Sequence, residues 1–154
     1  MREFLQRRLI APLLALLRQG VTPRELALCL ALGTTIGLIP VLGVSTMLCA
    51  MVAVLLKLNM PAIQLVNYLL MPLQLLLIIP LLRFGEHLVG APPYPVTVES
   101  VLALLSRGVL DAIRILASAI GHATLGWLVL AAPVGLVLYR ALEPVLRRLR
   151  PGVR

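Results

Sequence analysis

The chain has 154 residues, of which 60% are hydrophobic and only 13% are charged, and its mean hydropathy is +1.03. Soluble domains carry about 25% charged residues, so this composition excludes an ordinary soluble domain and indicates an integral membrane protein. Three runs contain no charged residue, at 26–56, 58–82 and 115–139. Each reaches or exceeds the roughly 20 residues that cross a bilayer, so we expect one all-α membrane domain over residues 1–154.

The net charge is +8, and the basic residues lie at the ends of the apolar runs rather than inside them. Arg24 precedes the first run, Lys57 and Arg83 bound the second, and Arg140 follows the last. This placement follows the positive-inside rule and predicts a multi-pass membrane protein with both termini in the cytoplasm. Aromatic residues make up only 4% of the chain, too few for base stacking, so we expect no nucleic-acid partner.

The sequence indicates neither a metal site nor a catalytic centre. Cys29 and Cys49 lie in apolar surroundings without the paired Cys or His spacing of a zinc site, so both are expected to pack as reduced thiols. The six acidic residues are scattered near segment boundaries, and the motif Gly-x-Ser-x-Gly is absent. We therefore expect no enzyme activity, no metal and no cofactor.

Residues 1–20 combine apolar and basic positions at helical spacing, with Leu9 and Leu13 on one face and Arg7 and Arg18 on the other. The pattern predicts an amphipathic helix that lies in the anionic cytoplasmic surface of the membrane. A signal peptide is the alternative interpretation. The segment before Arg24 offers no small-residue cleavage site, however, and the chain becomes apolar again at once.

The first apolar run is too long for one straight crossing. Thr22 is placed to cap a helix that begins at the following proline. As one helix, the 31 residues 26–56 would extend about 46 Å, against a hydrocarbon core of about 30 Å. A break at Pro40, with Gly37 and Gly43 on either side, predicts a broken helical hairpin over 23–57. The two arms return Arg24 and Lys57 to the same face of the membrane.

The second run repeats this layout over residues 59–89. Asn59 and Pro61 begin it, Pro72 interrupts it, and Arg83 ends it near the same membrane face. The spacing predicts a second broken hairpin and an internal repeat of architecture, although the two units share little residue identity. Both hairpins are either re-entrant or fully spanning; the sequence does not distinguish these alternatives.

Uncharged polar side chains gather around the two breaks. Non-helical backbone at membrane depth needs protein or a water-filled cavity to satisfy its amides, and the broken helices of transporters direct their ends at substrates. These side chains therefore either satisfy the backbone freed at the breaks or line a shared polar cleft. The candidate substrate-binding residues are Thr35, Ser45, Thr46, Asn59, Asn67 and Gln74, with Gly37, Pro40, Gly43, Pro61 and Pro72 as hinge residues.

A set of small, proline and polar residues carries a family resemblance: Pro23, Ala27, Gly33, Gly37, Pro40, Gly43 and Thr46, then Leu-Asn-Met-Pro at 58–61, Asn67, Pro72 and Gly85. With this spacing, about residues 20–90 resemble a bacterial membrane-protein family called domain of unknown function 2062. Many members carry Asn-Pro followed by Leu-Thr in the second unit, where this chain has Met-Pro-Leu-Gln at 71–74 and its asparagine at 67. The resemblance implies a small prokaryotic inner-membrane protein, in some cases joined to other domains, with no settled activity.

The end of the second unit holds a group of charged side chains. Arg83, Glu86 and His87 are spaced i, i+3 and i+4, which places them on one face of a continuing helix. They are interpreted either as an interfacial helix end whose side chains reach water, or as an anion or head-group site with His87 as a proton carrier.

Residues 90–97 are a proline-rich linker, and residues 98–145 are expected to form an amphipathic helix followed by a transmembrane helix. A single final crossing after two returning hairpins would leave the arginine-rich tail outside, against the charge rule. Either the segment 98–120 crosses and turns near Gly121 and His122, which we favour, or the last run breaks near Pro133. His122 is then a turn residue at the far interface rather than a ligand.

Two functions of different classes fit these features. The first is a transporter or a lipid or head-group translocase that uses a polar cleft between the two hairpins. The second is a non-transporting membrane anchor or an accessory subunit whose small residues allow close helix packing. The expected partners are membrane lipids and either further copies of the chain or a partner membrane protein.

Overall fold

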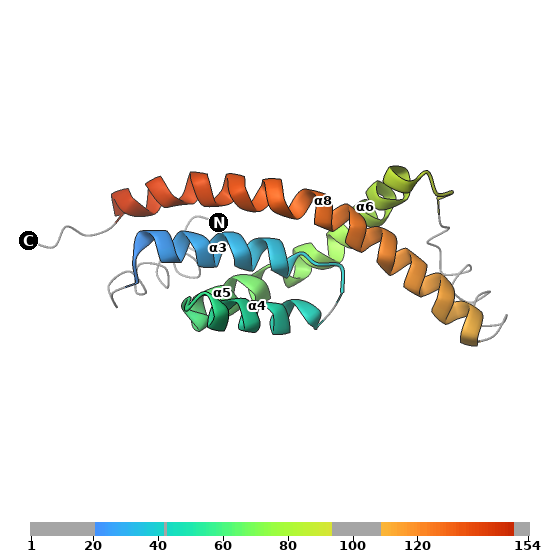
Figure 1. The fold of residues 1–154 in the computed structure, drawn as a ribbon, viewed down its shortest axis with the longest axis horizontal. Coiled ribbons are helices and arrows are strands. Elements are labelled where there is room, and N and C mark those ends of the chain that lie inside the picture. Colours follow the sequence, from blue (N-terminus) through green and yellow to red (C-terminus); the bar gives the residue numbers. More distant parts are fainter. Residues whose placement is uncertain (1–20, 42, 94–108, 150–154) are drawn as a thin grey trace, which may run out of the picture.

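The computed structural model describes residues 21–41, 43–93 and 109–149, and these residues form five helices and no strand (Figure 1). The helices are α3 (Pro23–Gly37), α4 (Val44–Leu55), α5 (Met60–Leu69), α6 (Met71–Val89) and α8 (Val109–Leu149). The all-α fold class is confirmed for this part of the chain. The predicted interfacial helix at 1–20, the linker residues 94–97 and the segment 98–108 lie outside the described residues.

Helix α3 begins and ends close to where the sequence predicts. The Thr22 hydroxyl accepts a hydrogen bond of 3.1 Å from the backbone N–H of Glu25, and Pro23 is the first helical residue. A capping side chain and a proline whose missing N–H would have no partner anyway are the usual start of a helix. The helix ends at Gly37, three residues before Pro40.

Helices α3 and α4 form the first hairpin. Figure 1 shows them side by side, joined by a connection at the end of α3 that is opposite to the start of the described chain. Leu58 and Met60, which follow α4, pack against a buried cluster that contains Leu26 from the first turns of α3. The chain therefore returns to the end of the molecule at which α3 began, as predicted from Arg24 and Lys57.

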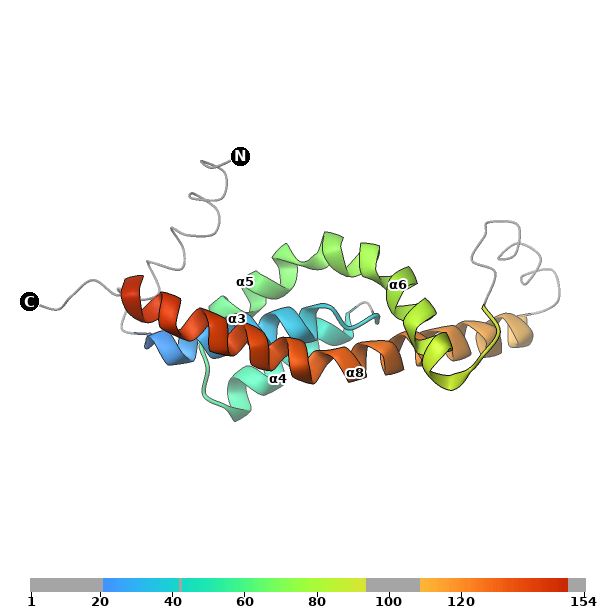
Figure 2. The ribbon, with the colours of Figure 1, turned by 90° about the horizontal axis from the view of Figure 1, so that it is seen from above.

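The second unit is not a hairpin, and the prediction from Pro72 and Arg83 is wrong in this respect. Figure 2 shows α5 and α6 as a single arch. Leu70 between them keeps a near-helical backbone (φ -88°, ψ -5°). Its N–H donates a hydrogen bond of 3.1 Å to the Val66 carbonyl, and its carbonyl accepts one of 2.7 Å from Gln74 N–H. Pro72 lies in the first turn of α6, where a missing N–H is tolerated. The proline therefore bends the chain rather than reversing it.

The arch carries the chain from one end of the molecule to the other. Leu146 of α8 belongs to the same buried cluster as Leu26, whereas Ala123 of α8 packs with Leu81 and Leu82 of α6. Leu146 and Ala123 lie 23 residues apart along α8 (146 − 123), which corresponds to about 35 Å of helix. Arg83 therefore lies at the opposite end from Lys57, and α5 with α6 spans a distance close to the thickness of a bilayer core.

The C-terminal region also differs from the prediction, because α8 is one helix of 41 residues without a turn at Gly121 and His122 or a break at Pro133. Contacts on both sides of Pro133 hold the helix against its neighbours. Gly126 packs on α6 and Gly135 packs on Thr35 of α3. Figure 1 shows that α8 bends where it crosses α6.

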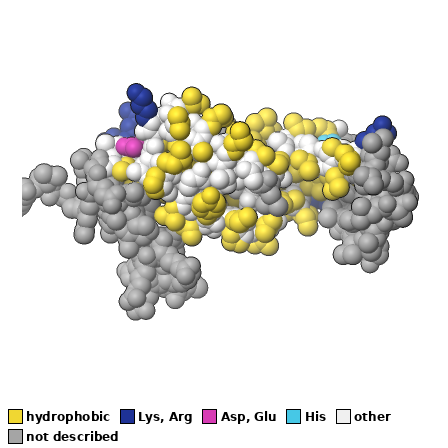
Figure 3. Space-filling model, turned by 90° about the horizontal axis from the view of Figure 1, so that it is seen from below, with side chains coloured by type: hydrophobic (Ala, Val, Ile, Leu, Met, Phe, Trp, Pro, Cys, Tyr) yellow, Lys and Arg dark blue, Asp and Glu magenta, His cyan; other side chains and the backbone are white. Residues whose placement is uncertain are grey.

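The outer surface of the molecule is largely apolar. Helix α6 and the part of α8 at Ile113–Leu149 are the described helices that are long and apolar enough to cross a membrane. Figure 3 shows one face covered by hydrophobic side chains, with the clearest basic side chains towards its two ends. Leu76 is 73% exposed and Leu128 is 58% exposed. Such exposure is normal against lipid and costly in water, which agrees with the membrane assignment.

Candidate functional site at the helix breaks

The first break leaves backbone groups without helical partners. Helix α3 ends at Gly37, α4 begins at Val44, and Ile39 and Pro40 between them are buried. Gly43 caps α4 with φ of +84°, a left-handed conformation that glycine adopts without strain. Within the connection Val41 N–H donates a hydrogen bond of 2.8 Å to the Ile39 carbonyl, and a carbonyl oxygen can accept a second bond from elsewhere in the protein.

Gln74 of α6 supplies one such partner. Its side-chain Nε2 donates a hydrogen bond of 2.6 Å to the backbone carbonyl of Ile39, and Gln74 itself is only 3% exposed. The residue follows the bend at Leu70 by four positions. The two helix breaks therefore lie against each other, and a side chain from one bonds to the backbone of the other.

Asn67 and Gln64 of α5 make a second connection, this time to α4. Asn67 Nδ2 donates hydrogen bonds to Thr46 Oγ1 (3.2 Å) and to Gln64 Oε1 (3.4 Å), and Gln64 Nε2 donates to the backbone carbonyl of Thr46 (3.0 Å). Asn67 is 4% exposed. We call the group of Ile39, Thr46, Gln64, Asn67 and Gln74 the break junction.

Close approach of α3 and α5 beneath the break junction depends on two glycines. A Cβ built on Gly33 would lie 3.0 Å from the carbonyl oxygen of Ile63, and one built on Gly37 would lie 3.1 Å from Asn67 Oδ1. Gly33 and Gly37 are four residues apart, the small-x-x-x-small spacing that lets helices pack closely in membranes. This spacing was available in the sequence as a signal that α3 has a packing face.

Trp127 of α8 joins the site although sequence reasoning did not predict it. Its Nε1 donates a hydrogen bond of 2.7 Å to the backbone carbonyl of Thr35, a residue 92 positions earlier in the chain. The Thr35 hydroxyl donates to the carbonyl groups of Ala31 (3.0 Å) and Leu32 (3.2 Å) within α3. The methyl group of Thr35 therefore lies against Gly135 of α8, and the polar groups of Thr35 are used inside the protein.

Of two further candidates from the sequence, Ser45 lies next to the break junction and Asn59 lies away from it. Ser45 is buried at the start of α4, next to Thr46. Asn59 caps α5, where its side-chain Oδ1 accepts a hydrogen bond of 2.9 Å from Ala62 N–H. Asn59 lies eight residues before Asn67, about 12 Å along the helix, and is separate from the break junction.

The charged candidates form a separate group at the other end of α6. Arg83 Nη1 donates to Glu86 Oε2 at 2.9 Å, with Glu86 3% exposed and His87 exposed in the last turn. Arg83 lies nine residues beyond Gln74, about 14 Å along the helix. The structure thus gathers the break residues into one group and Arg83, Glu86 and His87 into another, rather than into a single site.

A cavity of about 150 Å³ lies between α3, α6 and α8, next to the break junction. Its walls include Thr35 and Leu38, Leu77 and Leu81 of α6, and Trp127 and Leu130 of α8. Since Thr35 and Trp127 direct their polar groups at protein partners, the walls offer hydrocarbon to an occupant.

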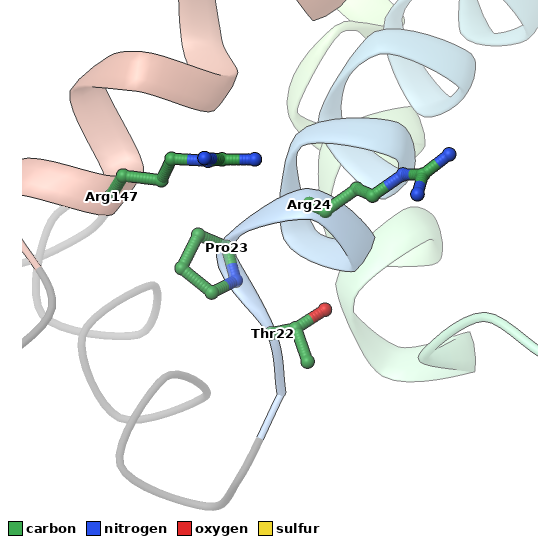
Figure 4. Close-up of a pocket in the computed structure, with 4 residues that line it drawn as sticks. All are labelled: Thr22, Pro23, Arg24 and Arg147. Carbon is green, nitrogen blue, oxygen red and sulfur yellow. The ribbon is translucent and has the colours of Figure 1, made fainter.

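A second pocket, of about 350 Å³, lies where the start of α3 meets the end of α8, and Thr22, Pro23, Arg24 and Arg147 line it (Figure 4). Arg147 reaches across Pro23 towards α3, whereas Arg24 extends away from Arg147. Arg147 also donates a hydrogen bond of 2.6 Å to Glu143, beyond the charge-free part of α8. The pocket brings the two ends of the described chain together, but its arginines do not converge on one point.

Within the described ranges, every buried side-chain nitrogen or oxygen has a hydrogen-bond partner. No group of three metal-ligating His, Cys, Asp or Glu side chains gathers in those ranges either. The break junction is therefore closed in this conformation. A polar ligand could enter it only by replacing hydrogen bonds that the protein now makes with itself.

The comparisons with known proteins extend the resemblance stated above. The family model described as "Uncharacterized protein conserved in bacteria (DUF2062)" matches residues 6–151, which is nearly the whole chain and more than the expected residues 20–90. No curated protein matches the chain. No solved structure matches it either.

Proposed function

The chain belongs to this bacterial family, and from its break junction we propose that the protein moves a membrane lipid, or the head group of one, across the inner membrane. The family description assigns no activity, so the proposal depends on the geometry. In this proposal α6 and α8 cross the membrane, and the α3–α4 hairpin enters from the end that carries Arg24, Lys57 and Arg147. That end is cytoplasmic by the positive-inside rule, and the described chain begins and ends there.

The observation that carries the proposal is the contact between the two helix breaks. Gln74 and Asn67 join helices that are distant in sequence, through side-chain hydrogen bonds to Ile39 O and Thr46 Oγ1. Each such bond contributes only about 0.5–1.5 kcal/mol net, so the junction can open at modest cost while the helices remain intact. Broken helices that meet at membrane depth are the usual location of substrate sites in secondary transporters.

A lipid suits this site better than a water-soluble solute. The space next to the break junction is apolar, and polar groups near it are already paired within the protein. An amphiphile can place its hydrocarbon there while its head group exchanges for the junction hydrogen bonds. A strongly hydrated solute would gain nothing from those walls.

The test is lipid movement in vesicles reconstituted with the purified protein. Phospholipids labelled on the head group are placed in both leaflets, and a membrane-impermeant reductant reports how fast the inner leaflet becomes accessible. We expect wild type to accelerate this movement over protein-free vesicles. The variants Gln74→Leu and Asn67→Ala are expected to change the rate about tenfold, because they alter the free energy of opening the junction by about 1.4 kcal/mol.

Matched controls lie beside each of these positions. Tyr68 follows Asn67 and Leu76 lies two residues after Gln74, and both are exposed on the outer surface. Tyr68→Ala and Leu76→Ala should move lipid at the wild-type rate. If the junction variants also keep the wild-type rate, the break junction is not the site, and if wild type moves no lipid above the protein-free rate, the proposed function is wrong.

The second candidate, an anchor or accessory subunit, is favoured by a different observation. Every buried polar side chain among the described residues is already satisfied, as expected for a junction that only stabilises the fold. In that case the exposed apolar faces of α6 and α8 would bind further copies of the chain or a partner membrane protein. A folded protein that moves no lipid, and whose junction variants lose stability alone, would favour this function.

A further inference from the structure

The cavity between α3, α6 and α8 differs from the break junction in chemistry. Its walls come from three helices that are far apart in sequence, and Leu81 in them is buried. Thr35 and Trp127 are the wall residues with polar side-chain atoms, and both use these atoms to donate hydrogen bonds to backbone carbonyls. A bound water needs two to four polar partners, so water is a poor occupant of this space.

The size of the cavity sets the size of the group that fits it. Apolar cavities of about 150 Å³ in proteins remain dry and accept a group of roughly benzene size. The volume here is about 150 Å³ as well. That is room for a short stretch of hydrocarbon chain, not for a whole lipid.

The cavity opens towards the outside of the bundle. Leu130 and Val134 of α8 lie on its wall, yet each remains 40% exposed. Both belong to a helix that is long and apolar enough to cross a membrane. In the membrane, the medium at this opening is therefore lipid hydrocarbon, which is continuous with the apolar wall.

We propose that this cavity is a binding site for the hydrocarbon chain of a membrane lipid, with Trp127 as part of its wall. The site deepens the proposed function, because it places the chain of the lipid beside the break junction that would handle its head group. Binding itself requires no lipid movement. The chain enters from the bilayer between α6 and α8 and packs against Leu77 and Leu81.

The protein supplies its own reporter, since Trp127 is the single tryptophan of the sequence. We would reconstitute the protein in phosphatidylglycerol and phosphatidylethanolamine vesicles and replace a fraction of the lipid with phospholipid brominated on its acyl chains. Bromine quenches tryptophan only at short range. We expect quenching of Trp127 to exceed the level set by the mole fraction of brominated lipid, and to saturate.

Two neighbouring alanines provide a matched pair of variants. Ala131 lines the cavity, whereas Ala132 is exposed and does not. Ala131→Leu should fill the space and reduce the excess quenching at least twofold, while Ala132→Leu should leave it unchanged. Leu130→Ala enlarges the cavity and should increase the quenching, which keeps the test decisive if the larger side chain at 131 prevents folding.

Each other outcome would overturn the proposal. Quenching that follows the mole fraction alone, equally in all variants, means ordinary contact with surrounding lipid. Absence of quenching means that the cavity remains closed, and quenching that falls as the protein-to-lipid ratio rises means that another copy of the chain covers it. The quenching measurement does not depend on lipid movement. A protein that binds the hydrocarbon chain but moves no lipid contradicts only the proposed function. A protein that moves lipid but shows no binding in the cavity contradicts only this site.

Discussion

The crossing of α6 and α8 provides the sharpest stability prediction, because two glycines of α8 lie in opposite environments. A Cβ built on Gly126 would lie 2.5 Å from the carbonyl oxygen of Leu81 and 3.1 Å from the backbone nitrogen of Gly85. A Cβ on Gly121 would meet nothing within 4 Å. Replacing each glycine with alanine therefore separates the packing effect from the effect on the helix itself.

The size of the effect follows from the distances. Ordinary contact begins near 3.4 Å, so the Gly126→Ala methyl group requires a local separation of about 0.9 Å between backbones that cannot rotate away. A gap of that size loses a quarter to a half of each contact energy, and overpacking typically costs about 1–3 kcal/mol. Alanine returns about 0.5–1 kcal/mol by favouring the helix, so the net loss in the free energy of unfolding is about 0.5–2 kcal/mol. Gly121→Ala has no overpacking cost and should show only the gain that alanine brings to the helix.

The assay is thermal unfolding of both variants in one mild detergent, followed by helical circular dichroism. We expect the midpoint to fall for Gly126→Ala and to stay level or rise for Gly121→Ala. Equal shifts of the two midpoints, in either direction, would refute the close crossing of α6 and α8. Gly85→Ala should behave like Gly126→Ala, since its Cβ would overlap the backbone carbonyl of His122.

Three further predictions concern one residue of the break junction and two helix caps. Gln74→Leu removes one of the two donors to the buried Ile39 carbonyl, which keeps its hydrogen bond from Val41 N–H, and should lower the free energy of unfolding by about 0.5–1.5 kcal/mol, measured by the same thermal assay. Gly43→Ala meets no steric obstacle but must hold φ of +84°, so it should cost about 1–2 kcal/mol, whereas a stable variant would mean that this turn relaxes freely. Asn59→Ala should lose about 1 kcal/mol with its helix cap, and Asn59→Asp should retain both stability and lipid movement; loss of movement in Asn59→Asp would give this residue a role beyond capping.

The helix boundaries were predictable because they depend on local chemistry. Thr22 and Pro23 start α3, and Asn59 with Pro61 starts α5, as capping rules require. Comparison of the length of the first run with the thickness of a bilayer was enough to predict its break. The caps involve residues within a few positions of each other, and the break follows from a length alone, so neither depends on how distant segments pack.

The path of the chain after each proline was not predictable in the same way. Pro40 lies in a connection of several non-helical residues and the chain reverses, whereas Pro72 lies in the first turn of a helix and the chain only bends. Pro133 lies within α8 and does not end that helix. A proline removes one backbone donor in each case, and tertiary contacts on either side decide the result.

The course of α5 and α6 also explains the charge problem that the sequence raised. With a second returning hairpin, one final crossing would have placed the arginine-rich tail on the far side of the membrane. Because the arch carries the chain to the opposite end, the single helix α8 brings it back, and Thr22 and Arg147 line the same pocket. The start of α3 and the end of α8 therefore lie together, although the route that we expected between them was wrong.

The candidate site residues fall into two kinds that differ in what movement would do to them. Asn59 bonds to a backbone group three residues away in its own helix, and Thr35 bonds to the preceding turn of α3. Such local bonds persist when helices move as rigid bodies, so neither can report an opening of the junction. The bonds from Gln74 to Ile39, from Asn67 to Thr46 and from Trp127 to Thr35 cross sequence separations of 35, 21 and 92 residues, and they must break if the helices part. If the protein moves lipid, loss of these long-range bonds should change its rate, whereas loss of the local ones should change only its stability.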